Sequence, residues 1–481
     1  MGKFKPYRAE QLMMFPNSIK DYVGEGHLAR VVDAVVERLD TADIEEKYSE
    51  LGQNTYHPKI LVKLLFYGYA LGERSGRMIA RRIETDTAYI YLAQMYQPDF
   101  RTINDFRKNH LKELSGYFVE IVRLSQELGL VKVGQINIDG TKIKADAANR
   151  LTKDKEGYQE WLKKTEANIQ EILAQADQRD AVEDQMYGDQ RGDELPEEIN
   201  TQEKLKKRLE EVIQRFQDEP AASPLGGKER INFTDADARF MKGGNGKIDA
   251  NYNCQIAVDG NQMIVASEVI TQANDRGALK LMVEASEKTL REPVREVAAD
   301  SGYSSYENYE YLSKSQKVGY VPDQRLMKVR SREYGPYHEE NFRYDERNDC
   351  YICPEDEKLI RYKERRQDSS YRQWRQVIYR GRTCSECVSK PLCTQQPQRT
   401  LARDDRRTLV DQMRKRLLSK EGREKYLQRL YTAEPVFGHL KHILGYRRFL
   451  LRTLRKVQGE FRLMCIGHNL KKIHRWWVLA T

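Results

Sequence analysis

Three acidic residues stand where metal-dependent chemistry would need them. Asp139 closes a strand-like run over residues 131–139, and Asp300 closes another over residues 294–300. Glu434 begins a helical stretch with a strongly basic tail behind it. Two aspartates at adjacent strand ends and a glutamate on a helix can hold two divalent cations, which activate one oxygen and stabilise the leaving oxygen in phosphodiester chemistry. Carboxylate oxygens suit Mg²⁺ or Mn²⁺ better than softer metals do.

The tail behind Glu434 carries charge of almost one sign. Between residues 438 and 475 its one acid is Glu460, and its bases are Lys441, Arg447, Arg448, Arg452, Arg455, Lys456, Arg462, Lys471, Lys472 and Arg475. The formal net charge of +9 is modest for 481 residues, so its distribution matters more than its sum. Such a stretch is typical of a polyanion-binding surface, and its place behind Glu434 favours DNA or RNA. A solvated helix face is the alternative.

A cluster of cysteines gives a separate signal. Two Cys-x₂-Cys pairs have the spacing of a zinc ribbon, and Cys393 trails them. The four ligands that this spacing predicts for a structural Zn²⁺ are Cys350, Cys353, Cys384 and Cys387. Reduced thiols without a metal, or a degenerate site, are the alternative.

Length and composition set broad limits. A chain of 481 residues allows two to four domains at ~100–200 residues each. No apolar run approaches the ~18 residues of a membrane span, and the N-terminal residues lack the apolar region of a signal peptide. We therefore expect no membrane partner and a cytoplasmic, nucleoid-associated location.

Residues 1–130 predict a helical N-terminal domain. Apolar residues at helical spacing predict a helix over residues 29–40, and Pro58 marks the start of another. A third is predicted over residues 77–84, and Thr102 is expected to cap a fourth. Short helices with surface arginines favour a DNA-binding domain, and a packing or dimerisation domain is the alternative.

Two separated stretches, residues 131–150 and 231–340, predict the parts of a mixed α/β core. The order is strand, long insert, strand, strand, helix and strand, with Asp139 on the first strand and Asp300 on the last. Asp275 is expected to cap the helix. This order matches the mixed sheet of a ribonuclease-H-like core.

The remaining stretches predict two insertions and a closing segment. Residues 151–230 carry two apolar helical stripes and predict a helical hairpin whose loop is 188–196. Residues 341–400 predict the Cys-rich, zinc-ribbon-like insertion. Residues 401–481 predict the C-terminal part of the core, with Glu434 and the basic helices.

Several short motifs, in order along nearly the whole chain, form one set. They are Phe15-Pro-Asn-Ser-Ile-Lys-Asp21, Val23, His27, Tyr56-His-Pro58, Leu65-Phe-Tyr-Gly-Tyr69, Ile138-Asp-Gly-Thr-Lys142, Ala299-Asp-Ser-Gly-Tyr303, Glu434-Pro-Val-Phe-Gly438, Lys441 and Asn469-Leu-Lys-Lys472. This set resembles the DDE transposases of bacterial insertion sequences. The resemblance is strongest to the "IS eleven-eighty-two" group of the insertion-sequence four/five assembly.

The resemblance implies a ribonuclease-H-like catalytic core, Mg²⁺ dependence, and DNA cleavage and strand transfer at element ends. It assigns Asp139, Asp300 and Glu434 as the acidic triad, which would hold the metal. Its partners would be double-stranded DNA, as transposon ends and target, and further copies of the chain in a homodimer or higher synaptic complex. The residues expected to contact DNA are Lys142, Tyr426, Arg429, Lys441, Arg447, Arg448 and Arg452.

One departure and two alternatives accompany this assignment. The family's glutamate signature has three residues between its Arg and its Glu, whereas four separate Arg429 from Glu434 here, which affects the role of Arg429. A catalytically silent or domesticated DNA-binding protein of the same fold is one alternative function, and a sequence-nonspecific nuclease is another. Other acids could also be ligands, although surface carboxylates are common: Asp146, Asp235, Asp237 and Asp259.

Overall fold

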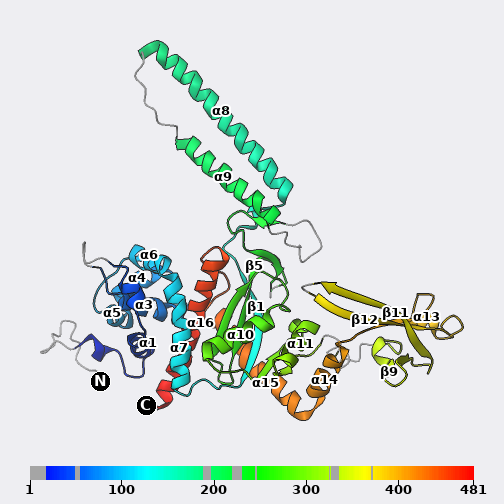
Figure 1. Cartoon of the computed structure of the whole chain (residues 1–481). Coiled ribbons are helices and arrows are strands. Elements are labelled where there is room, and N and C mark those ends of the chain that lie inside the picture. The colour runs from blue at the N-terminus through cyan, green and yellow to red at the C-terminus, as the bar shows by residue number, and fades with distance from the viewer. Residues whose placement is uncertain are drawn as a thin grey trace, which may run out of the picture.

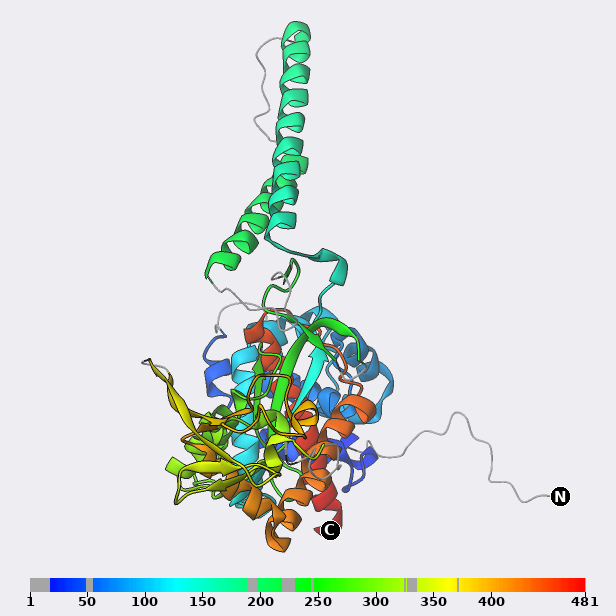
Figure 2. The same ribbon diagram turned by 90° about the vertical axis from the view of Figure 1, so that its right-hand side faces the viewer.

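The computed structural model describes residues 18–48, 55–187, 197–218, 230–243, 246–323, 326, 335–369 and 372–480. Figure 1 shows N-terminal helices on one side of a central sheet, a long helical hairpin that projects from one end of it, and a β-rich extension on the other side. The hairpin projects in the perpendicular view as well (Figure 2). Across the described residues, we find no helix with both the length and the apolar character needed to span a bilayer.

The N-terminal domain is helical, as the periodicity predicts. Its elements are η1 (Ile19–Tyr22), α1 (Leu28–Glu37), α2 (Ala42–Glu45), α3 (Pro58–Leu71), α4 (Gly76–Thr85), α5 (Thr87–Leu92), α6 (Phe100–Asn109) and α7 (Leu111–Glu127). Pro58 stands at the first position of α3, where its missing N–H costs nothing. Thr102 does not cap α6, because the Asp99 side chain accepts from Thr102 N at 2.7 Å. Residues 1–17 lie outside the described part.

The C-terminal helix α16 (Leu454–Ala480) joins this domain to the sheet. It packs on α7, α3 and α1 and also on strand β6 (Ile264–Ile270). The Asn469 side chain accepts from Ile264 N at 3.0 Å and donates to Ile264 O at 2.9 Å. It therefore pairs with the backbone groups of Ile264 at the outer edge of β6. The predicted C-terminal part of the core therefore also completes the N-terminal domain.

The central sheet is mixed. Strands β1 (Gln135–Lys144), β5 (Ile248–Val258), β7 (Glu296–Ala299) and β8 (Val318–Tyr320) follow the order β5-β1-β7-β8, with β4 (Arg239–Lys242) and β6 on the outer edge of β5. Strands β1, β7 and β8 are parallel, whereas β1 and β5 are antiparallel. Helices α10 (Ala278–Leu290) and α11 (Tyr306–Lys314) follow β6 and β7.

Strand β1 differs from its predicted bounds. It begins at Gln135 and runs to Lys144, so Asp139 lies within the strand and not at its end. The pairing of residues 137–144 with β5 keeps the backbone extended beyond the acid. Strand β7 ends at Ala299, and Asp300 follows directly, as predicted.

The helical hairpin consists of α8 (Lys155–Tyr187) and α9 (Glu197–Asp218). A small apolar cluster at its base includes Tyr158, Leu209 and Val212. The short strands β2 (Thr152–Lys153) and β3 (Ile231–Asn232) pair beside it, after η2 (Asn149–Leu151). The predicted loop 188–196 lies outside the described residues.

The β-rich extension contains η4 (Glu339–Asn341), β9 (Arg343–Asp345), β10 (Cys350–Ile352), β11 (Lys358–Ser369), β12 (Arg372–Gly381), α13 (Lys390–Cys393) and β13 (Thr400–Asp404). Its strands form one sheet in the order β13-β12-β11-β10-β9. Its buried apolar core comprises Phe342, Leu359, Tyr379 and Leu401. By contrast, one continuous apolar cluster runs through the N-terminal helices, the central sheet and α16.

Glu434 lies well inside a helix, whereas the sequence predicted that it begins one. After α14 (Arg407–Leu418), helix α15 runs over Lys420–Gly438 and continues into the π-helical turn η5 (His439–Ile443). Pro435 lies inside α15 and lacks an N–H, so the carbonyl of Tyr431 loses its helical donor. Gln262 Nε2 donates to that carbonyl at 2.7 Å, which ties the helix to the β5–β6 turn.

Candidate active site

The fold brings the three predicted acids together. Ile138 on β1 pairs with Ala299 on β7 in parallel register, so Asp139 and Asp300 follow these paired residues at the same level of the sheet. Helix α15 packs across β1 and β7. Its Arg429 contacts the first and the third acid, with Nη1 3.5 Å from Asp139 Oδ1 and Nη2 3.2 Å from Glu434 Oε1.

Arg429 is the residue whose role the sequence left open. It is buried, and its guanidinium lies 6.0 Å from the ring centroid of Tyr426. Its Nε is buried and has no hydrogen-bond partner among the residues that the structure describes. Because the guanidinium bridges Asp139 and Glu434, it stands where a cation would balance these acids.

The electrostatics distinguish Asp139 from an ordinary surface acid. Burial raises the pKa of Asp139 to about 6; Arg429 acts in the opposite direction, and Asp300 and Glu434 add to the rise. The Asp139 side chain is 14% exposed, whereas that of Glu434 is 48% exposed. A buried acid beside two others gains from a bound cation, because the cation offsets both desolvation and repulsion.

Hard oxygen donors and this charge fit Mg²⁺ or Mn²⁺. Within the described ranges, however, no three side chains of His, Cys, Asp or Glu are grouped closely enough to hold a metal ion as they stand. A bound ion would therefore have to displace Arg429 from at least one carboxylate and draw the acids together.

A fourth acid, Asp275, lies in the same site, and sequence reasoning assigned it to a helix cap. Its Oδ1 instead accepts from Lys142 at 3.2 Å, from Asn253 at 2.7 Å and from Gln255 at 2.8 Å. The N-cap of α10 is Gly277, which makes no side-chain cap bond. No local pattern pointed to this role, because the partners of Asp275 come from β1 and β5.

The glycines beside the two aspartates have a steric reason. A Cβ at Gly140 would clash with Gln255 Nε2, and a Cβ at Gly302 would lie 2.9 Å from Asp300 Oδ1 and 3.3 Å from Asp275 Oδ2. Gly302 N also donates to Asp300 Oδ1 at 2.8 Å. The Asp-Gly and Asp-Ser-Gly motifs therefore let backbone approach the acids closely.

Tyr303 is linked to the acids by hydrogen bonds through Gln255. It is fully buried, and its hydroxyl donates to Gln255 Oε1, while Gln255 Nε2 donates to Asp275. Burial holds the pKa of Tyr303 well above its usual value, and the neighbouring Asp275, Asp139 and Asp300 add to this. Tyr303 is therefore connected to Asp275 through Gln255.

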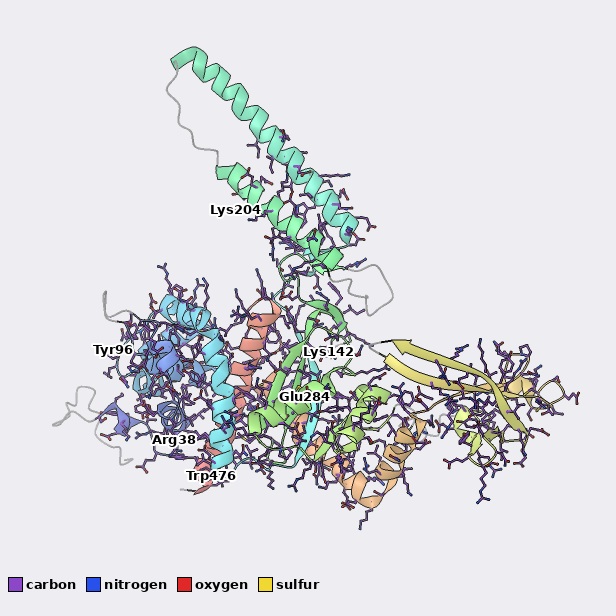
Figure 3. All side chains as sticks on the ribbon, viewed as in Figure 1. Arg38, Tyr96, Lys142, Lys204, Glu284 and Trp476 are labelled. Atoms are coloured by element: carbon purple, nitrogen blue, oxygen red, sulfur yellow. The ribbon has the colours of Figure 1, made fainter. Side chains whose placement is uncertain are left out.

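The predicted DNA-contact residues differ in exposure, because some are part-buried beside the acids and others are exposed. Lys441 on η5 donates to Thr141 Oγ1 and to Lys142 O, so its ammonium group contacts β1 two to three residues beyond Asp139, and burial lowers its pKa. Lys142, labelled at the central sheet in Figure 3, pairs with Asp275. Arg447 Nε donates to Lys441 O at 3.2 Å.

Two exposed arginines beyond them share one acid. Arg448 Nη2 lies 2.5 Å and Arg452 Nε 2.9 Å from the carboxylate of Asp146. Both belong to a loop alongside the end of β1, where Lys144 N donates to Arg447 O. Asp146 therefore forms ion pairs with both arginines at the rim of the site.

The other competing acids have structural partners. Asp235 accepts from the Tyr252 hydroxyl and from Thr453 N. Asp237 pairs with Arg215 and accepts from Leu454 N. Asp259 accepts from three backbone N–H groups around the β5–β6 turn. These contacts hold loops in place, and none joins the acids around Arg429.

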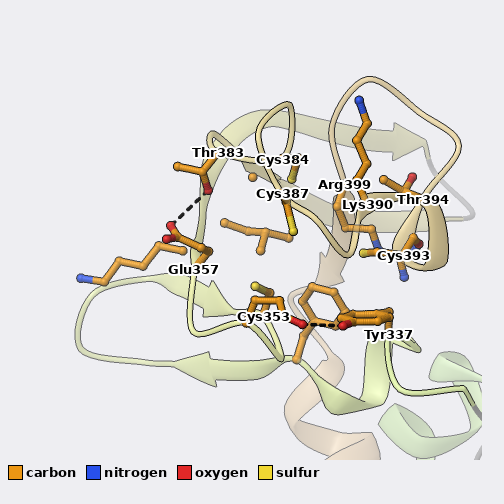
Figure 4. A pocket seen from close by; sticks show the side chains of 15 residues that line it. Tyr337, Cys353, Glu357, Thr383, Cys384, Cys387, Lys390, Cys393, Thr394 and Arg399 are labelled. Carbon is orange, nitrogen blue, oxygen red and sulfur yellow. Dashed lines mark hydrogen bonds between the residues drawn. The ribbon is translucent and has the colours of Figure 1, made fainter.

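The cysteines converge differently from the predicted set. Those that line one cavity in the extension are Cys353, Cys384, Cys387 and Cys393 (Figure 4). Cys350 does not line it and is buried in β10. Strand β10 ends at Ile352, and Cys353 lies in the turn that follows, so the two cysteines of this pair belong to different local structures. Burial raises the pKa of Cys393; Arg399 opposes this, and Cys384, Cys353 and Cys387 add to it.

Two models of transposase families match separate parts of the chain. A model described as "Transposase DDE domain" matches residues 352–474, which include Glu434 and Lys441. A model described as "Transposase domain (DUF772)" matches residues 17–109, which include α1 to α6. No curated protein and no solved structure matches the chain. The two family matches support an insertion-sequence transposase, an enzyme that cleaves DNA and transfers strands.

Proposed function

We propose that Asp139, Asp300 and Glu434 are the acidic triad of an insertion-sequence DDE transposase, which cuts DNA at the element ends and joins them to target DNA. One observation carries the proposal: a strand, a strand end and a helix distant in sequence converge, with Arg429 bridging two of the acids. The strand order and orientations also support a ribonuclease-H-like core. The resemblance to the "IS eleven-eighty-two" group remains part of this proposal.

The chain's own residues suit the proposed chemistry. Bound Mg²⁺ or Mn²⁺ would activate the attacking oxygen and stabilise the leaving oxygen of the phosphodiester. Asp139, Asp300 and Glu434 would hold these ions, and the Tyr303–Gln255–Asp275 chain would keep the floor of the site rigid. The same site would serve hydrolysis at the element end and the attack of the freed 3′ hydroxyl on target DNA. No nucleophilic side chain is required.

The DNA would lie across the basic rim beside β1. The exposed basic residues there are Arg447, Arg448 and Arg452, and Arg455 and Lys456 follow at the start of α16. Tyr426 and the buried Arg429 lie further in, beside the acids. In the N-terminal domain, Arg77 and Arg81 on α4 are exposed, which supports a DNA-binding role for residues 1–130. Transposition joins two ends, so we propose a homodimer or higher synaptic complex, acting at nucleoid DNA in the cytoplasm.

A plasmid assay tests the proposal. A supercoiled plasmid with the DNA that flanks the gene is incubated with the protein and Mg²⁺ or Mn²⁺, in parallel with Glu434→Ala. Cuts at fixed positions together with joined products, lost in the variant, are expected. Glu424→Ala is the matched control, because Glu424 is an exposed acid on the same helix.

The other outcomes separate the alternatives. Tight DNA binding without metal-dependent cleavage would favour a catalytically silent or domesticated DNA-binding protein of the same fold. Cuts at scattered positions without joined products would favour a sequence-nonspecific nuclease. Equal activity in wild type and Glu434→Ala would remove Glu434 from the triad.

A further inference from the structure

The cavity in the β-rich extension is lined by four thiols from three separate turns (Figure 4). Cys353 follows β10, Cys384 and Cys387 follow β12, and Cys393 ends α13. The cavity has a volume of about 30 Å³, which is enough for one ion or one water molecule. All four cysteines are free thiols in the structure.

The backbone around the thiols is shaped for close approach. Cys353 N donates to Glu357 O at 2.8 Å and Asp356 N donates to Cys353 O at 2.9 Å, which closes a tight turn over residues 353–357. Asp356 takes a left-handed φ of 58° in that turn. A Cβ at Gly381 would lie 2.5 Å from Cys384 Sγ, so the glycine makes room for this thiol.

The charged side chains that line the cavity have a small excess of positive charge. Lys358, Lys390 and Arg399 line it together with Glu355 and Glu357. A divalent ion held by four thiolates carries a net charge of −2, which this excess offsets in part. Among biological metals, thiolate sulfur selects Zn²⁺ in a tetrahedral structural site.

The extension also needs a cross-link that its core does not supply. Its buried apolar cluster has four residues, Phe342, Leu359, Tyr379 and Leu401, and partly buried side chains pack against it, including those of Cys353 and Cys393. Small domains with little apolar core are commonly held by disulfides or metals. Metal binding then contributes directly to folding.

We propose that Cys353, Cys384, Cys387 and Cys393 form a structural Zn²⁺ site, from which Cys350 is excluded. Each thiol releases its proton to solvent as it binds, so four protons leave for one ion. No three candidate ligands in the described ranges are yet close enough to hold an ion. The loops 353–357 and 383–393 must therefore close by moving their thiols into the cavity. This site is independent of the carboxylate site and of the proposed DNA chemistry.

Metal content of the purified full-length chain is the first measurement. Inductively coupled plasma mass spectrometry should find one Zn per chain in the wild type and in Cys350→Ser. The same measurement should find most of the Zn lost in Cys393→Ser and in Cys384→Ser. Cys350→Ser is the matched control, because Cys350 is a neighbouring cysteine of the same sheet that does not line the cavity. Zinc lost in Cys350→Ser but kept in Cys393→Ser would overturn the ligand set.

Cobalt substitution covers the case in which a variant does not fold. The metal-free wild type titrated with Co²⁺ should show visible bands of a tetrahedral ion and near-ultraviolet sulfur-to-cobalt charge transfer, saturating at one ion per chain. Weak octahedral bands without charge transfer would overturn the proposal. A wild type that contains no zinc, with these cysteines recovered as disulfides in mass-spectrometric mapping, would overturn it as well.

Discussion

The carboxylate site and the thiol site stand in opposite relations to their surroundings. The acids around Arg429 are held by a sheet and helix that share one large apolar cluster with the N-terminal domain. The thiols are carried by turns on an extension with a very small core. A large core can hold repelling acids in place before any metal binds, whereas a small core depends on its metal. The first site is thus held by the fold, and the second is proposed to hold the fold.

Zinc removal should produce the largest difference between the two regions. Structural zinc sites contribute about 10–16 kcal/mol of apparent binding free energy at neutral pH, so the extension should open when a chelator selective for soft metals removes the ion. Trypsin should then cleave quickly after the lysines and arginines of β11 and β12, while the central sheet stays resistant to proteolysis.

Mg²⁺ removal is the matched condition for that experiment. It should abolish cleavage of DNA and leave the tryptic pattern of both regions unchanged. Equal protection of the extension with and without the soft-metal chelator would contradict the comparison.

Substitution of Arg429 tests how much this cation contributes to stability by balancing the buried acids. Arg429→Gln removes the cation shared by Asp139 and Glu434, and breaking a buried pair costs about 3–5 kcal/mol. We expect roughly 3 kcal/mol, the lower end of that range, because Glu434 is half exposed. Urea unfolding without metal measures this loss, and saturating Mg²⁺ should restore part of it.

Arg423→Gln is the control for that substitution, since Arg423 is exposed on the same helix. Its free energy of unfolding should change little. An Arg429→Gln variant as stable as the control in the absence of metal would show that the fold holds the acids without this arginine.

Acid should also weaken the core, through a buried histidine pair. His439 Nδ1 and His468 Nδ1 lie 2.8 Å apart where η5 meets α16. Burial lowers the pKa of His439 to about 4 and that of His468 to about 3. The unfolded chain binds these protons near pH 6.5. The free energy of unfolding is therefore highest above that pH, where both histidines are neutral in the folded and unfolded chains. It falls as the pH drops from 6.5 toward 4, by up to about 1.4 kcal/mol per pH unit for each histidine.

Urea midpoints between pH 7 and pH 4.5 measure this dependence. His468→Asn should flatten it, and His442→Asn should not, because His442 is exposed on the same turn. Equal slopes in all three proteins would exclude the pair as the cause.

Much of the catalytic framework could be predicted from local pattern. The strand before Asp300, the β5–β6 hairpin, the projecting helices and most N-terminal helices follow from apolar spacing and turn residues. The three acids could be singled out because each belongs to a recognisable motif. Their convergence is observed, whereas their catalytic role stays a prediction.

What local pattern missed depends on contacts between distant segments. Asp275 has the sequence context of a helix cap, and its partners on β1 and β5 turn it into the site instead. Glu434 follows a stretch with weak helical periodicity of its apolar residues, so that periodicity did not show that α15 begins at Lys420. Cys350 and Cys353 have ligand spacing, yet the tight turn begins at Cys353 and leaves Cys350 in the strand.

The placement of α16 has a consequence for how the protein is made. Its neighbouring segment supplies Tyr446, whose hydroxyl donates to Tyr69 O across 377 residues of chain. At about 5–20 residues per second, ribosomes need roughly 20–75 seconds to make that interval. Helix α3 is buried on nearly every side in the finished protein, so its apolar surface waits in the nascent chain for partners that emerge much later. Synthesis of this protein should accordingly depend on chaperones that shield the early helices until the late one arrives.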